Sequence, residues 1–221
     1  MAIDRRSEIA GNLEAVREQI SQAADRAGRS ANEITLIAVT KTFPASDVEI
    51  LKDLGVTNFG ENRDADAAPK AAEISGIWHF QGQIQSNKLK SIAAWADVIH
   101  SIDDISHARK LSSLVGAKDI FVQVSLDGLP GRGGVNPEQL LDFLAEVTAL
   151  ANLKVRGLMA VAPLDEPPLE AFKRLKALSE TVIKTHPNTW EISAGMSNDF
   201  EAAISQGATH IRIGSQILGV R

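Results

Sequence analysis

Ile34-Thr-Leu-Ile-Ala-Val-Thr-Lys41-Thr-Phe-Pro44 is an apolar, β-branched run that ends abruptly at a lysine and a proline. No polar alternation divides the residues from Ile34 to Val39 into two faces, so they predict a strand buried on both faces, as in a parallel sheet. Pro44 cannot continue the strand and suits the first turn of a following helix. We therefore expect Lys41 at the C-terminal end of an interior strand.

Lys41 has two interpretations at this stage. A lysine that closes a strand is most often a solvated charge at the edge of the sheet. The alternative is an amine in a partly desolvated pocket, ready to form an imine with a carbonyl compound. The rest of the chain has to decide between them.

Composition excludes several classes of function. The net charge of −5 disfavours a general nucleic-acid binder, and the absence of cysteine excludes disulfides, thiolate metal sites and thiol nucleophiles. The start of the chain lacks an apolar signal core, and no apolar run approaches the ~20 residues that span a bilayer, so we expect a cytoplasmic protein without membrane contact. The chain also has no tyrosine, so no phenol of its own can serve as acid or base.

Short apolar runs alternate with helical patterns after an N-terminal amphipathic helix. That first helix is expected from about Asp4 to Gly28, because apolar residues recur there at spacings of three and four. The predicted strands are Ile34–Thr40, Thr57–Phe59, Ile77–Phe80, Val98–His100, Asp119–Ser125, Leu153–Met159, Trp190–Ser193 and His210–Ile213. The helices predicted between them are Ser46–Leu54, Asn62–Ile74, Lys88–Ala96, Asp104–Val115, Pro137–Leu150, Pro168–Thr185 and Asp199–Gln206, with Gln216–Val220 after the last strand.

Eight strand–helix units in one unbroken alternation predict a closed (β/α)8 TIM-type barrel with an additional N-terminal helix, formed as one domain over residues 1–221. A doubly wound open sheet is the alternative. The barrel is favoured because eight units close a barrel and no Gly-x-Gly-x-x-Gly follows the first strand. In this fold the chemistry belongs at the C-terminal ends of the strands.

Two glycine- and serine-rich segments follow the last two strands, where such barrels often hold phosphate. They are Ser193-Ala-Gly-Met-Ser197 and Arg212-Ile-Gly214-Ser215. Glycine lets the backbone approach an anion, and serine hydroxyls add donors. The alternative is ordinary helix capping by Ser197 and Asp199. An aldehyde that carries a phosphate needs such a site together with an amine, and we expect Lys41 across the barrel from it.

Arg212 is expected to point inward by strand alternation. A guanidinium keeps its proton, so beside a pyridine nitrogen it would act as a hydrogen-bond donor and leave the ring unprotonated. The alternative is an arginine paired with a carboxylate inside the barrel.

Other polar residues near the strand ends admit simpler roles. His79 has no second histidine or carboxylate at metal-ligand spacing, so a hydrogen-bonded interior residue is preferred to a zinc ligand. Segment 128–134, with Arg132, lacks the Walker ending and is interpreted as a flexible loop. Glu61 and Asn62 are expected either to bind a ligand or to cap the following helix.

Seven motifs taken together resemble the YggS/PROSC family, the pyridoxal phosphate homeostasis proteins, from about residue 8 to the end. In order, they are Ala38-Val-Thr-Lys41-Thr, Phe59-Gly-Glu-Asn62, Trp78-His-Phe-Gln-Gly-Gln-Ile-Gln-Ser-Asn-Lys88, Ile99-His-Ser-Ile-Asp103, Arg156-Gly-Leu-Met159, Gly195-Met-Ser197 and Ile211-Arg-Ile-Gly214. The family is a pyridoxal 5′-phosphate (PLP)-binding barrel, similar to the N-terminal domain of alanine racemase without its second domain.

The resemblance implies a cofactor and its ligands. Lys41 would carry PLP as an internal aldimine, and Arg212 would face the pyridine nitrogen. Asn62 and Met159 would line the cofactor, with His79 nearby, and the phosphate would lie around Ser193, Ser197, Gly214 and Ser215. The family is thought to handle free PLP without established turnover, so we expect no catalytic residue, no metal, a monomer, and PLP-dependent apo-enzymes as candidate partners.

Two residues depart from the family pattern, and one alternative function remains. Arg63 stands where many members have an aromatic residue, which leaves the contacts at that corner open, and Ser215 replaces a common threonine but keeps the hydroxyl. The alternative is a PLP-dependent amino-acid racemase or related α-proton chemistry. That chemistry needs a second acid/base opposite the lysine, which is a tyrosine in alanine racemase and has no counterpart in a chain without tyrosine.

Overall fold

The eight parallel strands form a closed barrel, in a computed structural model that describes residues 4–129 and 133–220. Strand order follows chain order, and β1 pairs with β8 to close the ring, which rules out the open doubly wound sheet. The strands are β1 Thr35–Val39, β2 Asn58–Glu61, β3 Ile77–Phe80, β4 Val98–Ile102, β5 Lys118–Gln123, β6 Leu153–Met159, β7 Glu191–Met196 and β8 His210–Ile213. The predicted (β/α)8 barrel is confirmed.

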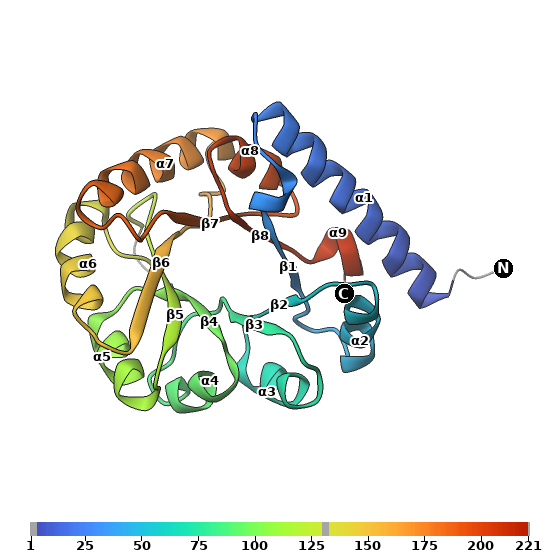
Figure 1. Ribbon diagram of the computed structural model, residues 1–221, viewed down its shortest axis with the longest axis horizontal. Coiled ribbons are helices and arrows are strands. Elements are labelled where there is room, and N and C mark those ends of the chain that lie inside the picture. Colours follow the sequence, from blue (N-terminus) through green and yellow to red (C-terminus); the bar gives the residue numbers. More distant parts are fainter. Residues whose placement is uncertain (1–3, 130–132, 221) are drawn as a thin grey trace.

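Helices surround the barrel, one after each strand (Figure 1). They are α2 Ala45–Asp53, α3 Asp64–Glu73, α4 Leu89–Trp95, α5 Ile105–Leu114, α6 Leu140–Thr148, α7 Pro168–Thr185, α8 Phe200–Ser205 and α9 Ser215–Leu218, with 3-10 turns η1 Ala31–Glu33 and η2 Pro137–Gln139. Within the two described ranges, no helix combines the length and the apolarity that crossing a membrane would need.

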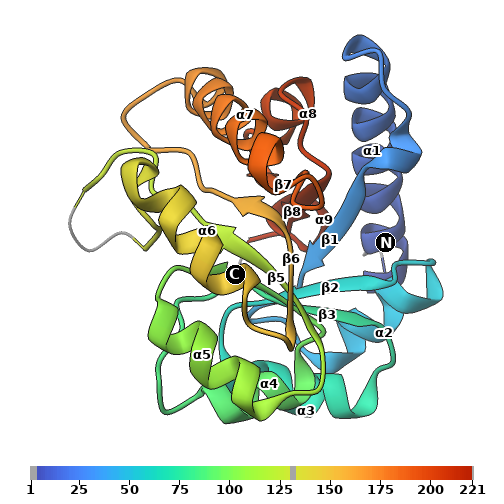
Figure 2. The ribbon, with the colours of Figure 1, turned by 60° about the vertical axis from the view of Figure 1, so that its left-hand side comes forward.

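The additional N-terminal helix α1, Arg5–Arg26, covers the outside of the barrel where it closes. Asp4 caps it by accepting hydrogen bonds from the backbone N–H groups of Arg6 and Ser7. Its buried face contains the predicted apolar residues Ile9, Leu13, Val16, Ile20 and Ala24. The helix packs against α2, α8 and α9 (Figure 2). Because α9 is only four residues long, α1 supplies apolar cover that the last strand–helix unit lacks.

Most predicted boundaries agree with the structure; two helix starts and the burial of β1 differ for physical reasons. The helix predicted from Asn62 begins at Asp64, because β2 continues to Glu61. The helix predicted from Pro137 starts as a 3-10 turn before α6. In β1 only Ile37 and Ala38 of the strand are fully buried, so the expectation of burial on both faces holds for the middle of the strand and fails at its ends.

The interior of the barrel is unusually polar. Rings from β3, β4, β5 and β8 meet there. The ring centroids of His79 and His100 lie 5.1 Å apart, and the His100 ring stacks on Phe121 with 4.5 Å between the centroids. His210 lies 5.1 Å from Phe121. The large apolar core lies instead between the strands and the helices, where rings such as Phe59 and Trp78 pack. The inside of the barrel is thus available for hydrogen-bonded polar groups.

Candidate functional site at the C-terminal rim

Lys41 emerges from a tightly held strand end into solvent. Its neighbour Thr40 donates its backbone N–H to the Gly60 carbonyl at 2.9 Å and its hydroxyl to Glu61 Oε1 at 2.7 Å. Lys41 itself is exposed, which agrees with a solvated lysine at the strand end and not with the alternative of an amine in a partly desolvated pocket.

Thr42, directly after Lys41, has a backbone φ of 68°. A β-branched residue rarely adopts this left-handed conformation, which costs on the order of 1–3 kcal/mol. Such strain is typical of functional sites. Sequence reasoning could not have found it, because threonine carries no signal for positive φ.

Gly214 brings the end of β8 against the end of β1. A Cβ atom on Gly214 would lie 3.1 Å from the Val39 carbonyl oxygen, so the two backbones are in close approach. The register pairs Ala38 with Ile213, so that Lys41 follows three residues after one partner and Ser215 two residues after the other. The phosphate-type segments therefore begin beside Lys41, and the expectation that they lie across the barrel is corrected: closure of the barrel makes the first and last strands neighbours.

The two glycine–serine segments lie together at the rim. Gln216 in α9 donates from Nε2 to the Ser197 carbonyl oxygen at 2.6 Å, which joins the loop after β7 to the loop after β8. Gly195 makes its turn at φ 95°, in the region that favours glycine. Across the described part of the chain, neither the Ser197 nor the Ser215 hydroxyl makes a hydrogen bond to protein. Two hydroxyls without a protein partner among the described residues and the start of α9 thus lie at the rim.

Capping does not account for these serines. Ser197 is not the N-cap of α8, which begins after Asp199, and the Asp199 carboxylate accepts a hydrogen bond from the Met196 N–H within the turn. Gly214, which has no side chain, is the N-cap of α9. The hydroxyls of Ser197 and Ser215 therefore remain available as donors to an anion.

Arg212 is a buried cation without a carboxylate partner among residues 4–129 and 133–220. It donates to Ser193 Oγ at 2.8 Å and to the Ala160 carbonyl oxygen at 3.1 Å. Burial lowers its pKa to about 10, so it keeps its charge at neutral pH. The alternative of an arginine paired inside the barrel is therefore not found, and the guanidinium is left with N–H groups and charge to offer a ligand.

Ser193 and His79 lie below the rim in a hydrogen-bonded layer. Ser193 is fully buried, and its hydroxyl contacts both Arg212 and His100 Nδ1 at 2.8 Å. His79 uses one ring nitrogen on His100 and the other on Asn58, as the interior-residue interpretation predicted. The structure thus separates Ser193 from the rim hydroxyls of Ser197 and Ser215, with which sequence reasoning had grouped it.

Asn62 has a buried amide oxygen, Oδ1, with no hydrogen-bond partner in the described structure. It does not cap α3, whose N-cap is Arg63 without a side-chain hydrogen bond, and Glu61 pairs with Lys70 instead. Gln81 Nε2, which lies close to Gly60 on the neighbouring strand, is likewise buried without a partner. A buried unsatisfied polar group costs about 1–3 kcal/mol, so both amides point to a ligand or water. Sequence reasoning missed Gln81, because a glutamine after a strand has no distinctive pattern.

Met159 lies inside the barrel, almost fully buried, in a small cluster with Val98 and Phe121. It pairs with Gln123 in the register between β5 and β6. The structure therefore places it at the end of β6, on the side of the barrel away from β1.

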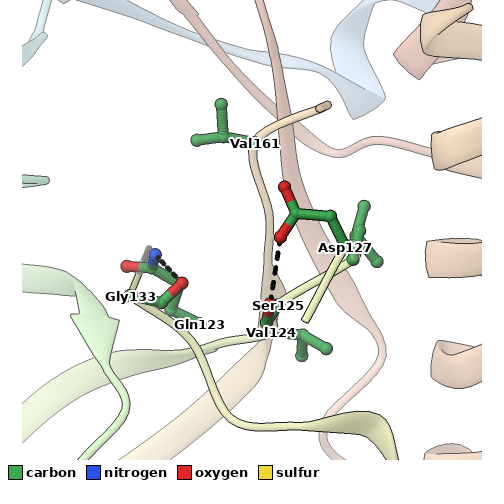
Figure 3. Close-up of a pocket in the computed structure, with 7 residues that line it drawn as sticks. Gln123, Val124, Ser125, Asp127, Gly133 and Val161 are labelled. Carbon is green, nitrogen blue, oxygen red and sulfur yellow. Dashed lines mark hydrogen bonds between the residues drawn. The ribbon is translucent and has the colours of Figure 1, made fainter. Parts of the chain in front are cut away.

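A cavity of about 230 Å³ lies beyond Met159, at the ends of β5 and β6. Gln123 donates to the Gly133 carbonyl oxygen at 2.9 Å, while Ser125 and Asp127 interact at one edge and Val161 faces them from the other side (Figure 3). Arg132, in the loop interpreted as flexible, lies outside the described residues. The cavity extends the mouth on the side away from Lys41.

Comparisons with known proteins point to one family. The family model for the alanine racemase N-terminal domain matches residues 11–221. The pyridoxal phosphate homeostasis protein of Mycobacterium leprae is 39% identical and aligns with 98% of this chain and 94% of its own length. The protein of the same name from Escherichia coli K12 is 37% identical, over 97% of each chain.

Solved structures agree with these relatives. PipY from Synechococcus elongatus PCC7942 is 31% identical, and the alignment covers 96% of this chain and all of PipY. The TM-score is 0.85 for PipY without PLP and 0.82 for PipY with PLP bound. The similarity therefore extends across the barrel, including all strand ends that form the candidate site.

Proposed function

Because this chain belongs to the pyridoxal phosphate homeostasis protein family, we propose that it binds PLP reversibly through Lys41 and takes part in intracellular PLP homeostasis. The observation that carries the proposal is the junction of β1 with β8. There an exposed amine stands next to two joined loops of glycine and serine, above a buried arginine.

Lys41 is the proposed point of covalent attachment. When bound, PLP supplies an aldehyde that condenses reversibly with an amine. The hydrogen bonds around Thr40 fix the backbone on one side of Lys41, and the strained turn at Thr42 follows on the other. The side chain itself is exposed, so a cofactor can reach the amine from solvent.

The phosphate is proposed to bind at Ser197, Gly214 and Ser215. The first backbone N–H groups of α9 lack partners within the helix, and the hydroxyls of Ser197 and Ser215 add two donors. Gly214 has no side chain to block this approach, and a Cβ atom there would fit only tightly against Val39. The phosphate would thus be held by neutral donors, with the nearby Arg212 adding positive charge.

The residues present also fit the ring of the cofactor. Arg212 offers N–H groups to an acceptor ring nitrogen, and its buried charge has no carboxylate partner in the described structure. Asn62 Oδ1 and Gln81 Nε2 supply an unpaired acceptor and an unpaired donor. We propose that Asn62, Gln81 and Met159 contact the cofactor, and that His79 and Ser193 act on it only through other residues.

Absorbance tests this proposal. The protein purified with PLP should show a visible band that borohydride abolishes, and Lys41→Ala should lose the band. Lys88→Ala is the matched control, because Lys88 is another exposed lysine, just before α4 on the same side of the barrel, and should keep the band. A wild-type protein that takes up no PLP, or a Lys41→Ala variant that keeps the borohydride-sensitive band, would refute the proposal.

We propose a carrier and not a racemase. Proton transfer at the α-carbon of an amino acid needs an acid/base opposite the lysine, and the chain supplies no tyrosine for this role. The relatives named above are homeostasis proteins, which agrees with a carrier. Incubation of the PLP-loaded protein with L-amino acids in D₂O separates the two functions: α-proton exchange well above that of free PLP would favour the enzyme.

Candidate recipients of the cofactor are PLP-dependent apo-enzymes. Free PLP is tested at the concentration that dissociation from the loaded protein would supply. If transfer is direct, the loaded protein should activate an apo-enzyme faster than this free PLP does. Equal rates would mean release into solution before uptake.

A further inference from the structure

A continuous hydrogen-bonded chain crosses the inside of the barrel and ends at Arg212. Asn58 Oδ1 on β2 contacts His79 Nε2 on β3 at 2.9 Å, and His79 Nδ1 contacts His100 Nε2 on β4 at 2.8 Å. His100 Nδ1 contacts Ser193 Oγ on β7 at 2.8 Å, and Arg212 Nη1 on β8 donates to the same hydroxyl at 2.8 Å. Each step joins side chains from different strands, so the chain links opposite walls.

Asn58 and Arg212, at the two ends of this hydrogen-bonded chain, fix the direction of every hydrogen bond in it. An amide oxygen only accepts, so His79 must donate from Nε2–H to Asn58. A neutral His79 then has a bare Nδ1, which accepts from His100 Nε2–H. His100 Nδ1 is bare in turn and accepts the Ser193 hydroxyl proton, while the Ser193 oxygen accepts from Arg212. Every donor and acceptor is satisfied when both imidazoles are neutral with the proton on Nε2.

The surroundings favour this neutral arrangement. Burial lowers the pKa of His79 to about 3 and that of His100 well below its ordinary value, and the nearby His210 and Arg156 lower both further, while Arg212 also lowers the pKa of His100. Glu191, a buried carboxylate at the start of β7, is already paired with Arg156. A proton added to His100 would place a second cation near Arg212, which makes no ion pair in the described structure and has only the Asp199 carboxylate acting on it from a distance.

The hydrogen-bonded chain is also held rigidly. The His100 ring is stacked on Phe121, with an angle of 15° between the ring planes, so the imidazole cannot turn without displacing a fully buried phenyl ring. The Ser193 hydroxyl is therefore oriented by a fixed acceptor, and its lone pair is presented to the guanidinium. Arg212 gains a second fixed contact at the Ala160 carbonyl oxygen.

We propose that His79 and His100 are positioning residues for Arg212: as neutral Nε2–H tautomers they orient Ser193, and through it the guanidinium, toward a ligand with an acceptor ring nitrogen. This inference rests on the proposed function, because the ligand is the PLP ring. It makes the two histidines determinants of specificity, although neither ring contacts the mouth of the barrel. The ligand class that they select is a phosphorylated aldehyde whose aromatic ring carries a nitrogen lone pair.

The first test measures the tautomers directly in the wild-type protein. Long-range ¹H–¹⁵N spectra of the full chain, with and without PLP, should show both His79 and His100 neutral and protonated on Nε2. Assignment uses single histidine variants. A proton on Nδ1 of either ring at neutral pH would overturn the proposal, whatever the protein binds.

The second test compares affinities for two ligands. His100→Phe keeps a ring that can stack on Phe121 but removes both nitrogens from the chain, so the affinity for PLP should fall about tenfold, as expected for loss of one or two oriented hydrogen bonds. Affinity for the analogue in which CH replaces the ring nitrogen should change less than about twofold. Equal losses for both ligands, or no loss for PLP, would overturn the proposal.

His210→Phe is the matched control. His210 belongs to the same ring cluster and is buried, but it contacts Thr209 at 2.9 Å and is not part of the chain to Arg212. His210→Phe should therefore leave the ratio of the affinity for PLP to the affinity for the analogue at its wild-type value. A change in that ratio as large as the one in His100→Phe would contradict the assignment. Asn58→Leu removes the terminal acceptor in a less buried position and should shift the ratio in the same direction as His100→Phe, so it serves if the latter does not fold. A wild-type protein that binds neither ligand refutes the proposed function alone, because the spectra still decide the tautomers.

Discussion

The Lys70 ammonium donates a 2.9 Å hydrogen bond to the carbonyl oxygen of Thr40, the residue directly before Lys41. The same ammonium lies 2.6 Å from Glu61 Oε1, which also accepts the Thr40 hydroxyl. Both charged side chains are buried, with 9% of the Lys70 and 0% of the Glu61 side chain exposed. A buried ion pair between α3 and β2 thus holds the backbone that presents Lys41.

Replacing Lys70 by methionine should destabilise the protein strongly. The Glu61 carboxylate would stay buried with only the Thr40 hydroxyl as partner, and breaking a buried pair in this way costs about 3–5 kcal/mol. Urea denaturation measures the loss in the free energy of unfolding. The double variant Lys70→Met, Glu61→Gln removes the stranded charge and should recover at least half of the loss. A double variant no more stable than the single one would contradict this account.

Gly214→Ala should weaken PLP binding. The new Cβ atom would lie 3.1 Å from the Val39 carbonyl oxygen and 3.2 Å from the Val39 Cβ, so the end of β8 has to move away from β1. We expect a loss of about 1–3 kcal/mol in unfolding free energy from the overpacking, and about a tenfold weaker affinity in a PLP titration.

Gly11→Ala is the control for that substitution. Gly11 lies inside α1, and a Cβ atom there would meet nothing within 4 Å. Alanine in the interior of a helix should stabilise the protein by about 0.5–1 kcal/mol and leave the affinity for PLP unchanged. If Gly214→Ala binds PLP as tightly as Gly11→Ala does, the close approach at Val39 is not needed for the cofactor.

Stability should fall as the pH drops below about 6.5. Burial lowers the pKa of His79 to about 3, that of His210 to about 4, and that of His100 well below 6.5. The unfolded chain binds protons at these residues near pH 6.5 while the folded chain does not, so each contributes about 1.4 kcal/mol of lost stability per pH unit below that value, until its folded pKa is reached. Urea denaturation at pH 7.0 and 5.5 measures the slope. It should be shallower in His210→Phe, and a stability that does not change over this range would contradict the prediction.

Arg212→Met should separate stability from binding. The variant removes a buried cation that has no carboxylate partner in the described ranges, at the expense of hydrogen bonds to Ser193 and Ala160. Burying a charge without an ion-pair partner costs free energy, and methionine removes that cost, which offsets the lost hydrogen bonds. We therefore expect the ligand-free protein to unfold within about 1 kcal/mol of the wild type or above it, while the affinity for PLP falls. A loss of several kcal/mol without ligand would show that Arg212 serves the fold.

Sequence patterns predicted the structure reliably where a pattern has a single dominant physical cause. Strand β6 and helix α7 lie where periodicity predicted them, because apolar spacing reports directly which face is buried. Asn62 shows the opposite case. Its position before a helix suggested a cap, but β2 runs on to Glu61 and the helix starts two residues later, so its amide oxygen is left for another partner.

The sequence by itself determined the alternation that closes into a barrel, the lysine at the end of the first strand, and the absence of a tyrosine for racemase chemistry. These follow from local periodicity and composition, which need no knowledge of distant contacts. Only the tertiary structure decided that β8 lies beside β1, that Ser193 belongs to the layer under the rim, and that two neutral histidines lead to Arg212. Those relationships join residues far apart in the chain, and barrel closure alone brings them within hydrogen-bond distance.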